Sequence, residues 1–150
     1  MSNDYDKDNI VLKKSFDFAL EIIELYKILK SKNEFVISKQ LLRSGTSIGA
    51  NVEEANAAQS KKDFATKMSI ASKEARETRY WLRLLNKSKL VEYDYKNYLN
   101  KIDELIRIIT AIVKTAQSNL SKHWKLNLEH LTFLMEYIWN QILNYYFVLF

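Results

Sequence analysis

The sequence predicts an all-α protein, an up-down-up-down antiparallel four-helix bundle with an additional C-terminal apolar helix. Three observations indicate this class. The 150 residues include no proline and only two glycines, whereas β folds with tight turns need many of both. Hydrophobic residues make up 47% of the chain and charged residues 27%, a composition that supports a packed core and excludes disorder. Apolar residues also recur at steps of three and four along several long segments, which is the spacing of a helix face.

The first expected helix covers residues 9–31 and has two apolar stripes. The first stripe consists of Phe18, Ile22, Leu25 and Leu29. The second stripe beside it consists of Phe16, Ala19, Ile23 and Tyr26. Because a bundle core needs only one stripe, this width predicts contacts with more than one neighbour. After this helix, Ser31 and Glu34 have the spacing of a capping box that starts the next helix.

The second expected helix covers residues 34–58 and contains both glycines, Gly45 and Gly49, four residues apart. Its apolar stripe consists of Leu41, Ile48, Val52 and Ala55. Each glycine inside a helix costs about 1 kcal/mol relative to alanine. We favour a helix over a loop because the periodicity continues on both sides, and we expect another backbone to approach closely at the glycines, by analogy with small-residue helix crossings in membranes.

Polar residues form a further stripe on the second helix. The stripe consists mainly of Ser, Asn and Gln beside the glycines, whereas Lys or Glu would be expected on a solvated face. If these polar groups are buried, they must be hydrogen-bonded. We therefore predict a structural polar network with charged partners that fixes helix register. Its residues are Gln40, Arg43, Ser44, Ser47, Asn51, Glu54 and Glu77. A polar lining at a subunit junction or pore is an equal alternative.

Two longer helices are expected at residues 61–89 and 92–120. The first of them starts with a cap signal from Ser60 and Asp63. Its heptad seam consists of Phe64, Met68, Ala71, Ala75, Thr78, Leu82 and Leu85. The seam of the other consists of Leu99, Ile102, Ile106, Ile109, Val113, Ala116 and Leu120. Short connections between helices of similar length predict antiparallel packing.

The chain is expected to divide into a bundle over residues 1–120 and an aromatic-rich, helical extension over residues 121–150. The extension has its own heptad-like stripe, namely Trp124, Leu128, Leu131, Met135, Ile138, Ile142, Tyr145 and Leu149. It is interpreted as a fifth helix on the bundle or as an oligomer contact. A membrane span is disfavoured because polar residues such as Glu136 and Asn140 interrupt the run of about 20 apolar residues that a span needs.

Positive charge is concentrated in residues 60–90, where nine Lys and Arg face three acidic residues, a net charge of +6. Such a patch is the electrostatic footprint of a polyanion partner. The candidate nucleic-acid-binding residues are Lys61, Lys62, Arg76, Arg79, Arg83 and Lys87. Arginine suits phosphate because its planar group donates two parallel hydrogen bonds. The alternative is that Arg76 and Arg79 are paired with acidic side chains such as Glu77.

Catalytic chemistry is not indicated. The chain has no cysteine, and its histidines are His123 and His130, neither of which follows an acidic residue at the Glu-x-x-His spacing of di-iron bundles. We expect no catalytic residue, no metal site and no cofactor, and we expect that the protein is not an enzyme. The acidic, polar start MSNDYDKDN does not resemble a signal peptide, so a cytoplasmic location is expected, without membrane contact.

Residues 9–120 contain runs that resemble a known family. The runs are QLLRSGTSIGANVEEANAAQSKKDF and KMSIASKEARETRYWLRLL. They closely resemble the bacterial four-helix-bundle proteins named for intervening sequences in 23S ribosomal RNA. The matching positions are Gln40, Leu41, Arg43, Ser44, Ser47, Ile48, Asn51, Val52, Glu54, Ala75, Arg76, Glu77 and Thr78.

The resemblance implies an up-down four-helix bundle that assembles into a ring, typically a homopentamer. It also implies kinship to the accessory proteins of diversity-generating retroelements, which are basic pentameric rings that bind a reverse transcriptase and nucleic acid. It implies no proven activity. We therefore expect a homo-oligomeric scaffold that binds RNA or a nucleic-acid-processing protein, with a protein-interaction module that uses no nucleic acid as the alternative. The extension 121–150 is outside the family pattern, and it is either an added helix or translated sequence beyond a lost stop signal.

Overall fold

The computed structural model describes the backbone of residues 9–149 and the side chains in this range except those of residues 123, 127 and 140–149. Within this range the chain forms four α-helices, which are α1 (Ile10–Ser31), α2 (Ile37–Asn56), α3 (Lys61–Ser88) and α4 (Lys96–Leu149). No strand occurs in the same range, so the predicted all-α class is confirmed. The chain divides into two compact units, Met1–Ala116 and Gln117–Phe150, which are described separately.

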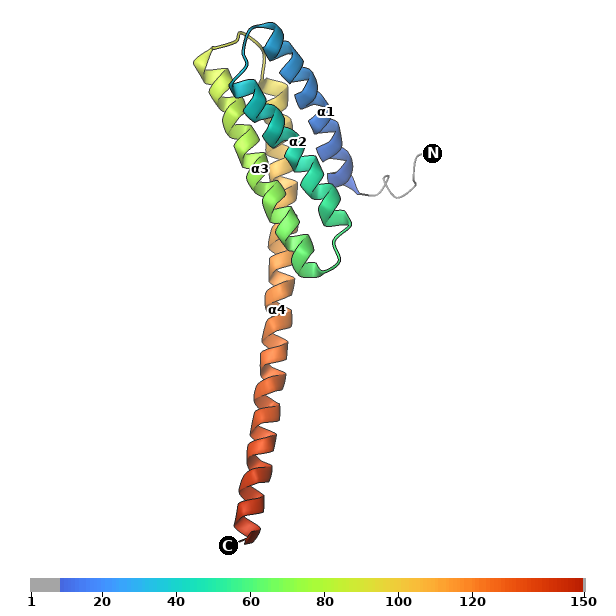
Figure 1. Cartoon of the computed structure of the whole chain (residues 1–150), viewed down its shortest axis with the longest axis vertical. Coiled ribbons are helices and arrows are strands. Elements are labelled where there is room, and N and C mark those ends of the chain that lie inside the picture. Colours follow the sequence, from blue (N-terminus) through green and yellow to red (C-terminus); the bar gives the residue numbers. More distant parts are fainter. Residues whose placement is uncertain (1–8, 150) are drawn as a thin grey trace, which may run out of the picture. The chain divides into compact units, whose positions relative to one another are not determined.

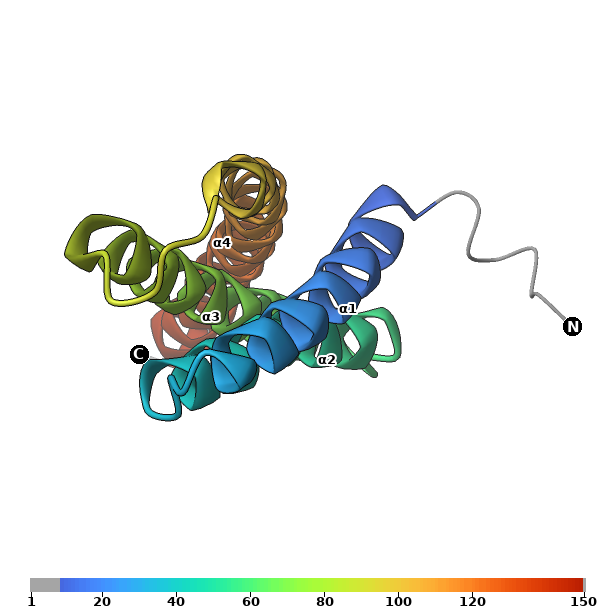
Figure 2. The ribbon, with the colours of Figure 1, turned by 90° about the horizontal axis from the view of Figure 1, so that it is seen from above.

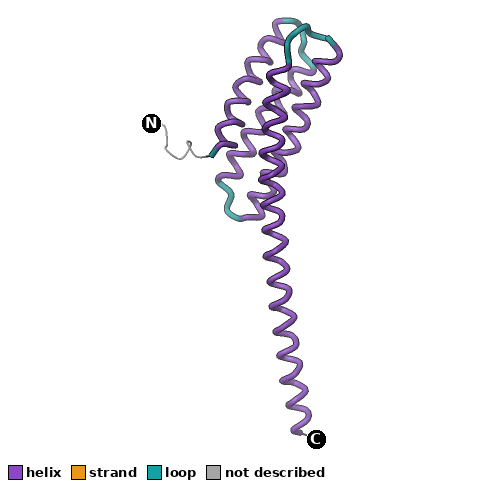
Figure 3. The backbone as a smooth tube through the Cα atoms, turned by 180° about the vertical axis from the view of Figure 1, so that it is seen from behind, coloured by secondary structure: helices purple, strands orange, loops and turns teal. Residues whose placement is uncertain are grey.

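The helices of the first unit alternate in direction, as predicted (Figure 1). The connections 32–36 and 89–95 lie at one end of the bundle, and the connection 57–60 lies at the opposite end (Figure 3). α2 packs against α1 and α3. The first part of α4 lies beside α3 (Figure 2) and closes the bundle, because its side chains form ion pairs with both α1 and α3.

The core is built from one apolar stripe of each helix. The predicted stripe of α2 is buried, and so is the α1 stripe that runs from Phe18 to Leu29. The other predicted stripe of α1, from Phe16 to Tyr26, is exposed or only partly buried. On α3 the seam from Met68 to Leu85 is buried, but Ala65 takes the buried position expected for Phe64, which is partly exposed. On α4 the core residues are Ile102, Leu105 and Ile109. Leu105 is buried in place of the expected Ile106, which is partly buried, as are Leu99 and Val113 of the predicted seam.

The predicted close approach of another backbone is found at Gly49 but not at Gly45, whose close neighbour is a side chain of α1. A Cβ atom on Gly45 would lie 2.8 Å from Ile22 Cγ2, closer than real Cβ contacts come. A Cβ atom on Gly49 would lie 3.4 Å from the backbone oxygen of Ser15, which is ordinary contact. The glycines therefore let α1 and α2 cross at short range, with the tighter contact at Gly45.

The capping box expected between Ser31 and Glu34 is wrong. Ser31 is still inside α1, and its hydroxyl donates to the backbone oxygen of Ile28 at 2.8 Å. Glu34 alone caps α2: its carboxylate accepts hydrogen bonds from the backbone N–H groups of Val36 at 3.0 Å, Ile37 at 2.8 Å and Ser38 at 2.6 Å. Burial by itself raises the pKa of Glu34, but these hydrogen bonds outweigh it, so the pKa lies below its ordinary value.

The two connections at the shared end of the bundle pack against each other. Tyr95, in the connection before α4, is 1% exposed, and its hydroxyl donates to the backbone oxygen of Val91 at 3.3 Å. Burial, together with the negative charges of Glu34 and Tyr93, raises the pKa of Tyr95 to about 12. The anchored Tyr95 keeps the connection non-helical up to Lys96, four residues beyond the expected start of the fourth helix.

The second unit is helical throughout residues 117–149, where it continues α4. The sequence predicted a separate additional helix, and this part of the prediction is wrong. Within the described range, residues 121–149 belong to the fourth helix. The physical reason is that the helical spacing of apolar residues is not interrupted near residue 120: steps of three and four lead from Val113 through Leu120 and Trp124 to Leu131.

Candidate functional site

The six candidate cations all lie on α3. Lys61 and Lys62 are exposed in its first turn, and Arg83 and Lys87 are exposed in its second half. The N-terminus of a helix carries partial positive charge, so the two lysines add to a positive end. Arg79, in contrast, is only partly exposed, because it faces α4.

Arg76 and Arg79 contact α4. Arg79 Nη1 lies 3.3 Å from Asp103 Oδ1, and Arg76 Nη2 lies 3.4 Å from the Thr110 hydroxyl. Arg76 Nη1 also donates to the Ser72 hydroxyl at 2.7 Å. In the described part of the chain neither arginine pairs with Glu53, Glu54 or Glu77. An arginine held by neutral hydroxyl groups keeps its full charge, so Arg76 remains a cation on the surface.

The candidate residues left out Lys73 and also Tyr80, which stands beside the cationic stripe in the sequence; both belong to the same exposed face of α3. The row of exposed residues consists of Lys62, Thr66, Lys73, Arg76, Tyr80, Arg83 and Lys87, and is called the α3 face below. The Tyr80 side chain is 57% exposed, and its ring packs edge-on against Trp81 with the ring centroids 4.9 Å apart. Both residues recur at steps of three and four on the side of α3 opposite the heptad seam, and this spacing could have identified them.

Two further cations lie on the side of α4 that meets α3. Asp103 and Thr110 contact the arginines of α3. Arg107 lies four residues after Asp103, and Lys114 lies four residues after Thr110, so all four share one side of α4. Arg107 and Lys114 are exposed. The surface over α3 and the first part of α4 therefore combines positive charge from two helices with one exposed aromatic ring.

The predicted polar-network residues do not form one network. Of those on α2, all of which the structure describes, only Arg43, Ser44 and Glu54 make hydrogen bonds or ion pairs to α3. Arg43 Nη2 lies 2.8 Å from Glu77 Oε1, which also accepts from Trp81 Nε1 at 3.2 Å. Glu54 pairs with Lys67. Among the remaining residues, Ser44 is buried against Thr78, Asn51 Nδ2 donates to the backbone oxygen of Ser47 at 2.9 Å, and Gln40 is exposed.

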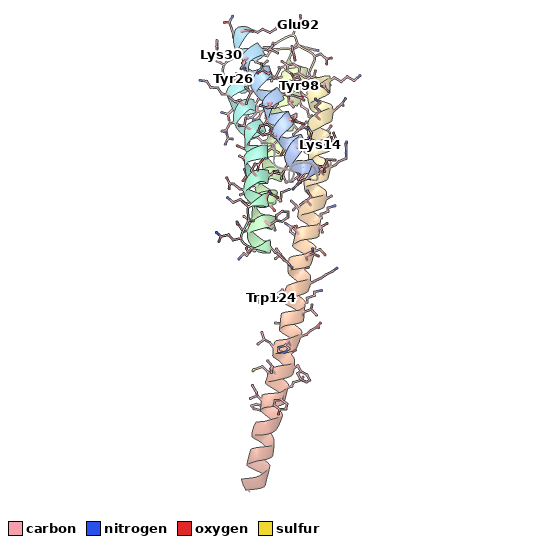
Figure 4. The ribbon with its side chains drawn as sticks, turned by 90° about the vertical axis from the view of Figure 1, so that its right-hand side faces the viewer. Lys14, Tyr26, Lys30, Glu92, Tyr98 and Trp124 are labelled. Atoms are coloured by element: carbon pink, nitrogen blue, oxygen red, sulfur yellow. The ribbon has the colours of Figure 1, made fainter. Side chains whose placement is uncertain are left out.

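A shallow hollow of about 170 Å³ lies between α1 and α4, lined by Lys14, Asp17, Phe18, Glu21, Lys101, Glu104 and Leu105. Figure 4 views this side of the bundle, with Lys14 labelled. Its charged groups are already paired: Lys14 Nζ lies 3.0 Å from Glu104 Oε1, and Lys101 contacts Glu21. The hollow thus offers a ligand no unpaired charge among these four side chains.

Apolar side chains are also exposed on α1. Phe16 and Leu20 are about half exposed, and Ile23 and Tyr26 beside them are partly buried. Phe16, Ile23 and Tyr26 belong to one of the two predicted stripes and Leu20 lies next to them, whereas the other stripe is fully used in the core.

The described residues show neither a metal site nor a membrane-spanning helix. No group of three or more histidine, aspartate or glutamate side chains in that set is arranged to hold a metal ion. Nor does any helix there combine the length and apolar character required to cross a bilayer.

Similarity to known proteins decides the family. A family model described as 23S rRNA-intervening sequence protein matches residues 7–111. The chain belongs to this family. It is also similar to a protein of unknown function from the S23 ribosomal protein family of Bacteroides thetaiotaomicron VPI-5482, whose crystal structure was determined at 1.70 Å resolution. The two chains are 49% identical, the alignment covers 72% of this chain and 98% of that one, and the TM-score is 0.68.

No curated protein matches the chain.

The family match confirms the resemblance predicted from the motifs around Gly45 and Glu77: the chain is a member of the 23S rRNA-intervening sequence protein family. The family match ends at residue 111, before the second unit begins at Gln117. The α3 face and the exposed stripe of α1 both lie inside the family region.

Proposed function

We propose that this member of the 23S rRNA-intervening sequence protein family is a non-enzymatic, homo-oligomeric scaffold that binds RNA through the α3 face. The observation that carries the proposal is the arrangement of Lys73, Arg76, Arg83 and Lys87 around the exposed ring of Tyr80. Proteins that hold single-stranded nucleic acid commonly combine cations that follow the phosphates with aromatic rings on which bases stack.

Charge along the surface favours a long, flexible polyanion over a small ligand. The α3 face extends from Lys62 to Lys87, which is about 38 Å along a helix that rises 1.5 Å per residue. Arg107 and Lys114 widen it on the α4 side. Binding of this kind depends on counterion release and is largely independent of sequence.

Assembly is the second part of the proposal, and it is supported by the exposed Phe16 and Leu20 of α1. Large apolar side chains grouped on one face are typical of a contact with another protein surface. In a homo-oligomer each copy would present its own α3 face, so weak individual contacts with one RNA would combine through avidity.

The test is fluorescence anisotropy with single-stranded and hairpin RNA over a series of salt concentrations. We expect binding that weakens as salt rises, and we expect the variant Arg83→Glu/Lys87→Glu to bind more weakly than the parent. Loss of two phosphate contacts should lower the slope of log affinity against log salt by roughly 1.4 for a single strand. The matched control Lys13→Glu/Lys30→Glu makes the same charge change on exposed positions of α1 and should bind like the parent.

A protein-interaction module without nucleic acid is the competing function. It is favoured by the pairing of Arg79 with Asp103, which removes one cation from the surface. Absence of RNA binding at low salt, or equal loss in both double variants, would leave this function as the better one.

A further inference from the structure

We propose that residues 124–149, called the tail helix here, associate with the tail helices of other copies of this chain in a coiled-coil-like bundle. This contact is separate from the one proposed for α1, and it does not depend on RNA binding. The tail helix lies in the second compact unit, beyond the region matched by the family model.

The first support is the amount of apolar surface. Ten large apolar side chains between residues 124 and 139 are 41–69% exposed, namely Trp124, Leu126, Leu128, Leu131, Phe133, Leu134, Met135, Tyr137, Ile138 and Trp139. At 100° per residue, all but Leu126, Phe133 and Tyr137 lie within about 80° of the centre of the heptad-like stripe. A large aromatic side chain presents roughly 150–250 Å², so the side chains near the stripe leave on the order of 700 Å² of surface open. A monomer typically exposes no apolar patch above about 300–600 Å², whereas a stable interface buries about 800 Å² per partner.

The second support is the spacing, which selects another helix as the partner. Trp124, Leu128, Leu131, Met135 and Ile138 follow alternating steps of four and three, and the sequence continues the steps at residues 142, 145 and 149. This seven-residue repeat keeps one stripe in register with a second supercoiled helix over many turns.

The third support is charge, which permits a second copy. Residues 121–150 contain two lysines and two acidic residues, so identical tails do not repel one another. Lys125, Glu129, Thr132 and Glu136 fall on one strip of the helix, about 80–140° from the centre of the heptad stripe by a turn of 100° per residue. A bundle of identical tails can therefore place every heptad stripe inside and every charged strip in water (Figure 4 draws the described side chains, with Trp124 labelled).

The absence of cysteine from the natural sequence makes the proposal easy to test with single introduced thiols. Met135 lies near the middle of the stripe, so its position meets the equivalent region of another copy in a parallel or an antiparallel pair. We expect Met135→Cys to form covalent dimers with a short bis-maleimide in the full-length protein. The adjacent residue gives the matched control, because Glu136→Cys lies on the charged strip and should react several-fold less.

Mass measurement supplies the second readout. Leu131→Glu places a charge in the stripe of every copy, whereas Thr132→Glu places the same side chain on the charged strip. Native mass spectrometry should find fewer copies per particle for Leu131→Glu than for Thr132→Glu, with circular dichroism confirming that both variants remain helical. Equal masses for these two variants, or equal cross-linking of the two thiol variants, would overturn the proposal.

The cross-link also separates this contact from the assembly proposed through α1. In the double variant Leu20→Glu/Met135→Cys the cross-link should persist, since the tail helix associates by its own stripe. If Leu20→Glu abolishes the cross-link, the tails meet only because the bundles do, and self-association by the tail helix is wrong.

Discussion

The hydroxyl groups of Ser44 on α2 and Thr78 on α3 lie 3.0 Å apart in a hydrogen bond, and both side chains are fully buried. Thr78 Oγ1 is also 2.8 Å from the backbone oxygen of Glu74. Arg43 with Glu77 and Glu54 with Lys67 flank this pair towards the surface. The buried bond thus specifies one antiparallel register between the two helices that pack most closely in the bundle.

Removal of either hydroxyl should destabilise the bundle by about 1 kcal/mol, because the remaining hydroxyl is left buried without its partner. Ser44→Ala, Thr78→Val and the double variant form a cycle that can be measured by urea denaturation. The double variant should lose less than the sum of the single losses. As a control, Thr66→Val on the exposed side of α3 should change stability by less than about 0.5 kcal/mol.

Alanine should have opposite effects at the two glycines of α2. At Gly45 the new methyl group would overlap Ile22, so we expect a loss of about 1–3 kcal/mol from overpacking. At Gly49 the methyl group fits, so the gain in helix propensity, up to about 1 kcal/mol, should dominate. Thermal unfolding checks both variants, and a larger loss at Gly49 than at Gly45 would contradict the contact geometry. The larger Gly49→Leu should nevertheless disrupt folding more than Leu at the exposed Ala57.

Glu34 should make stability depend on acid pH. Its pKa is lowered in the folded protein, so its contribution is present above the ordinary value of 4.5 and is lost as the pH falls from there through the folded pKa. Glu34→Gln removes the charge, and loss of a good helix cap typically costs about 1 kcal/mol at neutral pH. The difference between parent and variant in urea denaturation should shrink between pH 7 and pH 3. A difference that stays constant would show that the carboxylate charge is unimportant.

Charge removal at Asp103 should strengthen RNA binding. Asp103→Asn frees Arg79 from its carboxylate partner and deletes a negative charge beside the α3 face. One additional phosphate contact should tighten binding by roughly two- to fivefold at low salt and steepen its salt dependence. Fluorescence anisotropy measures both, with Asp17→Asn on α1 as the charge-matched control. Weaker binding by Asp103→Asn would mean that Arg79 is held in place by the carboxylate in order to bind.

The exposed stripe of α1 should hold copies of the bundle together. We expect Leu20→Glu to lower the number of copies per particle when it is combined with Leu131→Glu, which disables the tail helix. Native mass spectrometry at low micromolar concentration compares this double variant with Leu131→Glu alone. The same mass for both would remove the support that α1 gives to a homo-oligomer.

The periodicity of apolar residues predicted most of the core, because the stripe that each helix buries is already visible in its own sequence. The Ser60 cap is an example that depends only on local residues, and its hydroxyl accepts from Asp63 N at 3.1 Å as expected. Glu34 was misassigned because the Ser-x-x-Glu spacing does not show where α1 ends: Ser31 is still inside that helix, so Glu34 caps α2 without it. The start of α4 was misplaced for a similar reason, since Tyr95 is fixed by tertiary burial.

The candidate surface was only partly predictable. The cations of α3 are visible as a composition bias, but the partner of Arg79 lies 24 residues away on α4 and follows from helix packing alone. Tyr80 stands beside the cationic stripe in the sequence, but its exposure, which leaves the ring open to a base, follows from the packing of the helices. The side of α4 that contributes Arg107 is likewise set by which stripe of that helix becomes buried.

The short connections between neighbouring helices have a consequence for synthesis. Contacts between α1 and α2, and between α2 and α3, join segments that follow each other directly along the chain. Helical bundles with such local contacts fold in microseconds to milliseconds, and a chain without proline has no slow isomerisation step. Ribosomes add only about 5–20 residues per second. Each hairpin of helices should therefore close soon after it leaves the ribosome, so every copy is folded before it meets another.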